Sequence, residues 1–206
     1  MAGTAVSIAF TGHRPVKLAC GYDESHPVCL RVKERLEELI RAEAGSSGRL
    51  RFLTGMAMGT DIWAAELVLK VRASAPEADV ELVCAVPYEG HIEVMADEGW
   101  RRRYRTVLAA AAEVRVLAPS FTRSCMEERD RWMVDHADRV IAVLNESRAM
   151  ARIMEIAKLP PEQAIPADSG TAVTVRYALS LGKPVTAIDP TNGCCVVHFG
   201  ADEKRG

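Results

Sequence analysis

Short apolar runs alternate with longer amphipathic segments along this chain of 206 residues, and this alternation constrains the fold more than any other feature. The apolar runs are rich in Val, Ile and Leu and are continuous, which is typical of strands that are covered on both faces of a sheet. They predict strands over residues 6–11, 50–54, 80–86, 114–117, 139–144 and 185–188.

The segments between these strands carry apolar residues at helical spacing. In the first of them, residues 27–44, one helix face carries Val28, Val32, Leu36 and Ile40. Further helices are predicted over residues 60–73, 93–112, 124–137 and 170–181. Strands that alternate with helices predict an α/β fold. We expect a Rossmann-like, mainly parallel, doubly wound sheet of six or seven strands, with helices on both faces and the first strand central.

The same pattern sets the expected domain organisation. Residues 1–190 are predicted to form a single domain, and residues 191–206 to follow as a polar C-terminal tail that exposes the vicinal pair Cys194 and Cys195. Residues 145–168 separate a strand from the next helix by more than twenty residues, which is longer than most connections in compact domains. We expect this segment to be an inserted lid or loop.

Composition argues against several classes of protein. With 26 Lys and Arg against 28 Asp and Glu, the net charge of −2 does not favour a protein that grips nucleic acid through its phosphates. The basic and aromatic stretch 100–105 fits helix-surface ion pairs with Asp97 and Glu98. No run reaches the roughly 20 apolar residues of a membrane span, and the N-terminus lacks a signal-peptide pattern, so we expect a cytoplasmic protein. The six cysteines follow no zinc-ligand spacing, so no metal is predicted. No cofactor is expected either.

Polar residues follow the first predicted strand, at the place where α/β proteins bind ligands. In a parallel sheet, ligands collect at the carboxyl ends of the strands. There the chain reads Thr11, Gly12, His13 and Arg14, followed by Pro15. Proline disfavours a helical conformation of the residue before it, so Arg14 is predicted to be extended and to project from the strand end. Its guanidinium would suit a phosphate ester, although a surface ion pair would also explain an arginine here.

Two glycine-bearing loops open predicted helices farther along the chain. The first contains Gly55, Met56, Ala57, Gly59, Thr60 and Asp61, and the second contains Ser169, Gly170 and Thr171. Backbone N–H groups at a helix start favour an anion, but tight turns and ordinary N-caps explain the same residues. If chemistry occurs, Glu89, which follows the strand at 80–86, is the best candidate for a catalytic carboxylate, with Asp61 next.

Five segments carry a resemblance to a known family. In chain order they are TGHRPVKLACGYD, LTGMAMGTDIWAAE, AVPYE, ERDRWMVDHADRVIAVLNES and SGTAVTVRYALSLGKPV. Together they resemble the YpsA-like branch of the SMF/DprA–LOG superfamily over about residues 6–190. The resemblance implies a Rossmann-like sheet, a nucleotide or nucleotide-derived ligand and a homodimer, with the three loops named above lining the site. The YpsA-like branch itself has no settled activity.

The resemblance leaves more than one function open, because the superfamily includes cytokinin-releasing phosphoribohydrolases and a recombination mediator that binds single-stranded DNA. The phosphoribohydrolases carry P-G-G-x-G-T-x-x-E, whose glutamate acts in catalysis. Thr174 stands at that position here, and a threonine cannot serve as general acid or base near neutral pH. We therefore expect a sensor or binding module for a phosphate-bearing nucleotide derivative. A hydrolase of N-glycosidic bonds is the alternative, and single-stranded DNA binding is the least favoured function.

Overall fold

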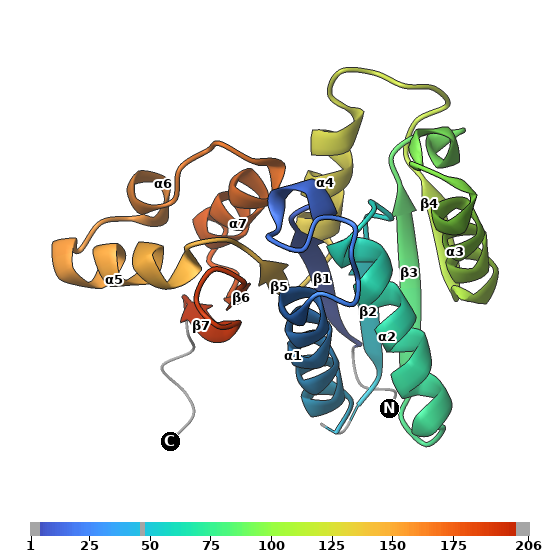
Figure 1. Cartoon of the computed structure of the whole chain (residues 1–206), viewed down its shortest axis with the longest axis horizontal. Coiled ribbons are helices and arrows are strands. Elements are labelled where there is room, and N and C mark those ends of the chain that lie inside the picture. Colours follow the sequence, from blue (N-terminus) through green and yellow to red (C-terminus); the bar gives the residue numbers. More distant parts are fainter. Residues whose placement is uncertain (1–4, 46–47, 201–206) are drawn as a thin grey trace.

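The computed structural model describes residues 5–45 and 48–200, which build a seven-stranded sheet flanked by helices (Figure 1). The strands lie in the order β4-β3-β2-β1-β5-β6-β7. Their bounds are β1 Val6–Gly12, β2 Leu50–Thr54, β3 Val80–Val86, β4 Glu113–Val116, β5 Arg139–Val143, β6 Val185–Asp189 and β7 Cys195–Phe199. Strands β1 to β6 run parallel, and β7 pairs antiparallel with β6. The predicted Rossmann-like sheet with a central first strand is confirmed.

The helices are α1 Pro27–Ala44, α2 Thr60–Ser74, α3 Glu98–Ala110, α4 Cys125–Asp135, α5 Ser147–Ala157, α6 Pro161–Ala164 and α7 Gly170–Ser180. Side chains cap the starts of three of the helices described, α1, α3 and α7, through His26, Asp97 and Ser169. One predicted helix, 93–112, is divided, because Asp97 caps α3 by accepting a hydrogen bond from the Trp100 amide at 3.0 Å. A 3₁₀ turn, His91–Val94, precedes it. None of the helices described is long and apolar enough to cross a membrane.

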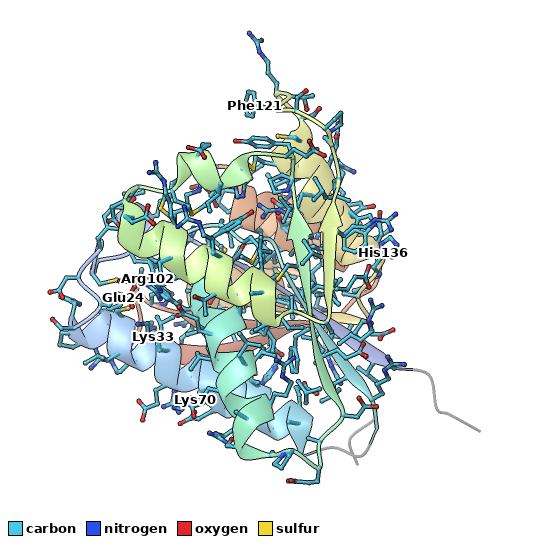
Figure 2. All side chains as sticks on the ribbon, turned by 90° about the vertical axis from the view of Figure 1, so that its right-hand side faces the viewer. Glu24, Lys33, Lys70, Arg102, Phe121 and His136 are labelled. Carbon is cyan, nitrogen blue, oxygen red and sulfur yellow. The ribbon has the colours of Figure 1, made fainter. Side chains whose placement is uncertain are left out.

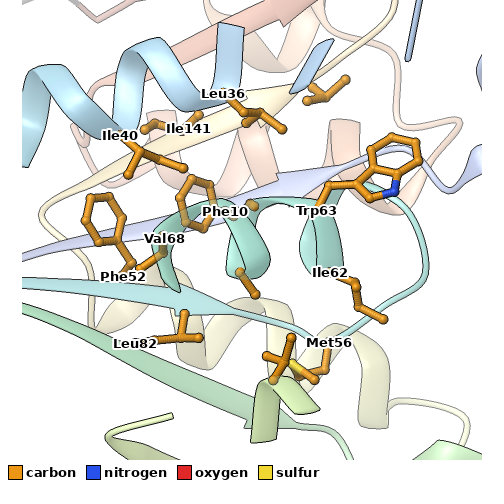
Figure 3. Packing of buried hydrophobic residues seen from close by; sticks show 14 of the residues in the cluster. Phe10, Leu36, Ile40, Phe52, Met56, Ile62, Trp63, Val68, Leu82 and Ile141 are labelled. Carbon is orange, nitrogen blue, oxygen red and sulfur yellow. The ribbon is translucent and has the colours of Figure 1, made fainter. Parts of the chain in front are cut away.

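The helices cover both faces of the sheet and bury a separate apolar cluster on each. Helices α1, α2 and α3 cover one face and contribute to a cluster that contains Phe10 and Phe52, whose rings stack with centroids 5.6 Å apart (Figure 3). Helices α4 and α7 pack on the other face, where Met133 and Val175 contact the strands. Successive strand residues point to opposite faces, so the continuous apolar runs of the sequence fill both clusters.

The C-terminal segment corrects one expectation. We expected residues 191–206 to be a tail outside the sheet, but Cys195–Phe199 form β7 and pair with β6. Cys194 is buried and not exposed, with 1% of its surface accessible. The turn between the two strands contains Asn192 and Gly193, a dipeptide that is a strong hairpin signal and marks this strand in the sequence. Residues 201–206 lie outside the described residues.

The segment 145–168 contains the short helices α5 and α6, which lie beside β6, β7 and α7 (Figure 1). Its start is attached to the sheet by Asp189 at the end of β6. The Asp189 carboxylate accepts hydrogen bonds from the backbone N–H groups of Glu146 and Arg148, at 3.1 and 2.9 Å. The segment therefore has helical structure of its own, and its role as a lid stays a prediction.

Candidate functional site

A pocket of about 390 Å³ opens at the carboxyl ends of the strands, beside the central pair β1 and β5. The connections leave the sheet there toward opposite faces, which creates the crevice in which open α/β sheets bind ligands. Its volume falls within the range of small-molecule sites. This β1–α7 pocket is lined by Thr11, Gly12, His13, Arg14, Val16, Lys17, Ala57, Asp61, Met126, Arg129, Asp130, Asp168, Ser169, Gly170 and Thr171.

The loop after β1 presents a cation to this pocket. Arg14 is exposed and extended, with φ −66° and ψ 155°, which confirms the effect predicted for Pro15 on the residue before it. His13 is buried beside it. Burial, and then the charge of Lys17, lower the pKa of the His13 imidazole, so its ring is uncharged at neutral pH. Positive charge in this loop therefore comes from Arg14 and Lys17.

The start of α7 forms the opposite wall and faces the pocket with backbone. Ser169 is the N-cap, and its hydroxyl accepts a hydrogen bond from the Ala172 amide at 3.2 Å. Gly170 and Thr171 follow in the first turn, whose N–H groups have no intrahelical acceptor. A Cβ added at Gly170 would meet no atom within 4 Å. This helix start is open to the pocket and carries the positive end of the helix dipole.

The start of α2, predicted as an equivalent loop, is closed. Only Ala57 and Asp61 of its six predicted residues line the pocket. The other four serve packing: Met56 is buried, Thr60 donates a hydrogen bond to the His13 carbonyl, Gly59 contacts Pro15, and Gly55 lies against the Arg129 guanidinium. This loop is a wall of the pocket, and it reaches the pocket through Ala57 and Asp61.

Glu89 does not reach the pocket. Its side chain is exposed, and its backbone N–H donates a hydrogen bond to the Ala118 carbonyl at 3.0 Å. Strand β3, after which Glu89 lies, is separated from β1 by β2, so its carboxyl end is away from the central crevice. Asp61 is the predicted carboxylate that does line the pocket.

Six residues that line the pocket were not predicted as site residues: Val16, Lys17, Met126, Arg129, Asp130 and Asp168. Arg129 of α4 is the buried one among them. Its guanidinium is buried and donates a hydrogen bond to the Gly55 carbonyl. It also forms ion pairs with Asp130, at 2.7 Å from Nε to Oδ1, and with Asp61, at 3.6 Å from Nη1 to Oδ2. Arg129 thereby joins the two carboxylates at the base of the pocket and attaches α4 to the α2 start.

A signal for Arg129 exists in the sequence. Cys125, Arg129 and Met133 are spaced four residues apart, and in the structure all three lie on the buried face of α4. An arginine in an apolar stripe requires a buried partner, since an unpaired buried charge is strongly unfavourable. The stripe therefore indicates a buried ion pair but does not indicate which carboxylates complete it.

Asp61 has the chemistry of a proton acceptor near neutral pH. Burial raises the pKa of its carboxyl group to about 6, although the neighbouring Arg129 charge acts in the opposite direction. Its Oδ2 accepts a hydrogen bond from the Ala57 amide at 3.2 Å. No cluster of three or more His, Cys, Asp and Glu that could hold a metal ion is found among the described residues.

Thr174 of α7 lies behind the pocket wall. Its side chain is buried, and its hydroxyl donates toward two oxygens, the Gly170 carbonyl at 2.8 Å and Oδ2 of Asp130 at 3.3 Å. The position that a catalytic glutamate would occupy in the phosphoribohydrolases is therefore filled by a hydroxyl engaged in internal contacts.

The fold and this crevice define a Rossmann-like α/β protein with a ligand-sized pocket at its central strand ends. The chain belongs to the YspA SLOG family, whose model matches residues 8–160. It is 26% identical over 138 residues to the uncharacterized SPbeta prophage-derived protein YoqJ of Bacillus subtilis (strain 168). That match covers 62% of this chain and 80% of YoqJ.

A solved structure has the same fold. It is DNA processing protein A from Helicobacter pylori, described for its unique single-stranded DNA binding mode. The superposition has a TM-score of 0.55 and 17% sequence identity, and covers 92% of this chain and 71% of that protein. At this identity the likeness establishes the fold.

Proposed function

We propose that this protein is a binding or sensor module that holds a phosphate-bearing, nucleotide-derived ligand in the β1–α7 pocket. The observation that carries the proposal is the pairing of the exposed Arg14 guanidinium with the open start of α7 across one pocket. Helix N-termini attract phosphate through free N–H groups and the helix dipole. Arginine adds charge-assisted hydrogen bonds with a planar fork of donors.

Two of the three acidic residues of the pocket are compatible with such a ligand. Arg129 forms ion pairs with both Asp61 and Asp130, so the base of the pocket is not a bare cluster of negative charge. The third, Asp168, is exposed to solvent, which screens its charge. Carboxylate oxygens accept hydrogen bonds, and the hydroxyls of a ribose are suitable donors. Phosphate therefore belongs at Arg14 and α7, and the sugar belongs nearer the carboxylates.

Binding is favoured over N-glycosidic hydrolysis. Thr174 replaces the carboxylate that the phosphoribohydrolases use, and its hydroxyl is engaged by Gly170 and Asp130. Of the two carboxylates considered for catalysis, Glu89 lies away from the pocket, and Asp61, which lines it, is engaged by the Arg129 guanidinium and the Ala57 amide. We expect no release of free base when the protein is incubated with nucleotides.

Single-stranded DNA is the second candidate ligand, because a protein of the same fold is described as binding it. Both candidates present a phosphate ester to the same basic groups. They differ in length and charge: a DNA strand contacts several phosphates at once, so its affinity falls steeply with salt concentration. The net charge of −2 is the argument that ranks this candidate second.

One experiment separates these functions. Nucleoside monophosphates, NAD, ADP-ribose and a short thymidine oligonucleotide are tested for thermal stabilisation of the protein, with chromatography for released base or ribose phosphate. Stabilisation by a mononucleotide or dinucleotide without product supports the proposal. Product formation would identify an enzyme, and tight oligonucleotide binding with a steep salt slope would identify a DNA-binding protein. No stabilisation by any of them would overturn both binding functions.

A further inference from the structure

A second cavity continues the β1–α7 pocket between helices α4 and α7. This α4–α7 groove has a volume of about 260 Å³. Met126, Asp130 and Gly170 line both the groove and the pocket, so the two spaces adjoin. The groove then follows α7 past Val173 to Tyr177.

We infer that the α4–α7 groove receives the nucleobase of the ligand whose phosphate binds at Arg14 and the α7 start. This inference rests on the proposed function. The first argument is length. Val173 lies three residues after Gly170, and one helical turn rises about 5.4 Å. A nucleobase is joined to its 5′-phosphate through one ribose, which spans this distance. The base can therefore lie in the groove while the phosphate stays at the α7 start.

The second argument is the chemistry of the groove walls. Met126 and Val173 provide apolar surface, and a thioether adapts to flat aromatic groups. The Tyr177 ring is held in place, because its hydroxyl donates to Asp135 at 2.7 Å and the Arg131 guanidinium lies over the ring at 4.7 Å from its centroid. Preordered aromatic and guanidinium planes are the surfaces on which bases stack.

The other neighbouring cavity is a poorer place for a base. It lies on the β5 and α5 side of the pocket and has a volume of about 170 Å³. Charged side chains line both cavities: Lys17, Glu146 and Asp168 here, and Arg123, Glu127, Asp130 and Arg131 in the groove. Most of the exposed lining surface is polar here and apolar in the groove. Charged side chains would lose hydration against an uncharged ring, which is unfavourable. The groove, which is larger and has the more apolar lining surface, therefore takes the base.

The test compares ribose 5-phosphate with AMP by calorimetry, because the two share a sugar phosphate and differ in the base. The blocking variant is Val173→Trp, which fills the groove one turn away from the phosphate-binding end of α7. The matched control is Leu181→Trp, which adds the same ring to an exposed position after the end of α7. Tyr177→Ala is a second variant that removes the aromatic wall if the first does not fold.

We expect the parent protein and the Leu181→Trp variant to bind AMP at least tenfold more tightly than ribose 5-phosphate. Either groove variant should reduce this ratio to about one and leave the affinity for ribose 5-phosphate unchanged. Equal affinities in the parent protein, or a ratio that survives in the folded groove variants, would overturn the nucleobase subsite alone. If the parent protein binds neither probe, the phosphate site fails and the subsite fails with it.

Discussion

The starts of α2 and α7 look alike in the sequence and differ in the structure. Both open a predicted helix, both contain glycine, and both were expected to offer amides to an anion. At α2 the protein satisfies its own groups: the Thr54 hydroxyl donates to the Asp61 carbonyl at 2.9 Å, and the Ala57 amide donates to the Asp61 carboxylate at 3.2 Å. At α7 the cap uses one hydroxyl, that of Ser169, and the surface around Gly170 is open.

The difference shows that a glycine marks a close approach without identifying the group that approaches. At Gly55 that group is the guanidinium of Arg129, which would overlap an added Cβ. At Gly59 it is the Pro15 ring, with Cδ 2.7 Å from an added Cβ. At Gly170 the space belongs to solvent or to a ligand. The closed start should therefore determine stability and the open start should determine affinity.

The largest effect is expected at the closed start. The Arg129→Met substitution keeps the volume of the side chain but leaves the carboxylates of Asp61 and Asp130 without their ion-pair partner. Breaking a buried pair costs about 3–5 kcal/mol of unfolding free energy. Urea denaturation measures this loss of unfolding free energy. The control is Arg102→Ala on the exposed side of α3 (Figure 2), whose unfolding free energy should stay within about 0.5 kcal/mol of the parent value. A loss below about 1 kcal/mol would mean that Arg129 does not hold the α2 start.

The next effect concerns affinity at the open side. The Arg14→Ala substitution should weaken binding of the stabilising nucleotide by about 1.5–3 kcal/mol, the range of a hydrogen bond to a charged group. That is a roughly ten- to hundredfold loss in Kd. The thermal stability of the unliganded protein should be unchanged because the side chain is exposed. Lys should restore part of the affinity, since it keeps the charge and lacks the fork.

The opposite outcome for Arg14 is distinguishable. If the Arg14→Ala protein loses stability and its folded fraction keeps the parent affinity, Arg14 is a structural residue and the open side does not bind phosphate through it. The Arg102→Ala control should change neither quantity.

A pair of glycine substitutions tests the comparison directly. Gly55→Ala places a methyl group into the Arg129 guanidinium, and overpacking of this kind costs about 1–3 kcal/mol. Gly170→Ala places the same group into open space and should change the unfolding free energy by less than about 0.5 kcal/mol. Equal losses of unfolding free energy in the two variants would show that both helix starts are equally tightly packed, which contradicts the distinction between a closed and an open start.

The smallest effect is a pH dependence of ligand affinity that originates at Asp61. Burial raises the folded-state pKa from 3.8 to about 6, so the ionised carboxylate opposes folding above about pH 6, and this penalty disappears as the pH falls toward 4. Loss of the charge also removes repulsion of an anionic ligand. Removing one unit charge at about 4 Å in a water-like dielectric is worth about 1 kcal/mol, or roughly fivefold in Kd, and this is the upper limit here because the sugar lies between Asp61 and the phosphate.

ADP-ribose is the appropriate probe for this measurement, because its phosphates are linked as a pyrophosphate diester and lack the monoester ionisation near pH 6. Its affinity should rise as the pH falls from 7 to 5. The Asp61→Asn variant should lose that rise, whereas an equal rise in the variant would assign the effect to another group, with His13 the nearest candidate in the pocket.

Several parts of the site followed from local rules. Pro15 makes Arg14 extended through a clash between neighbouring residues, and Ser169 caps α7 through a hydroxyl three residues from its donor. Other parts of the structure did not follow from such rules. Strand β7 was missed although Asn192 and Gly193 signal its hairpin, because the segment was interpreted as a polar tail.

The sequence by itself determined the α/β class, the parallel sheet with β1 at its centre and the strand ends at which a pocket forms, because periodicity and chain order act through neighbouring elements. Only the tertiary structure decided which helix start is open. That outcome depends on Arg129, whose hydrogen bond to Gly55 joins residues 74 positions apart. The strand order of the folded sheet also places Glu89, which follows β3, two strands away from β1. Contacts between distant segments depend on the packing of whole helices on the sheet, and local spacing does not encode which side chain will fill a glycine's space.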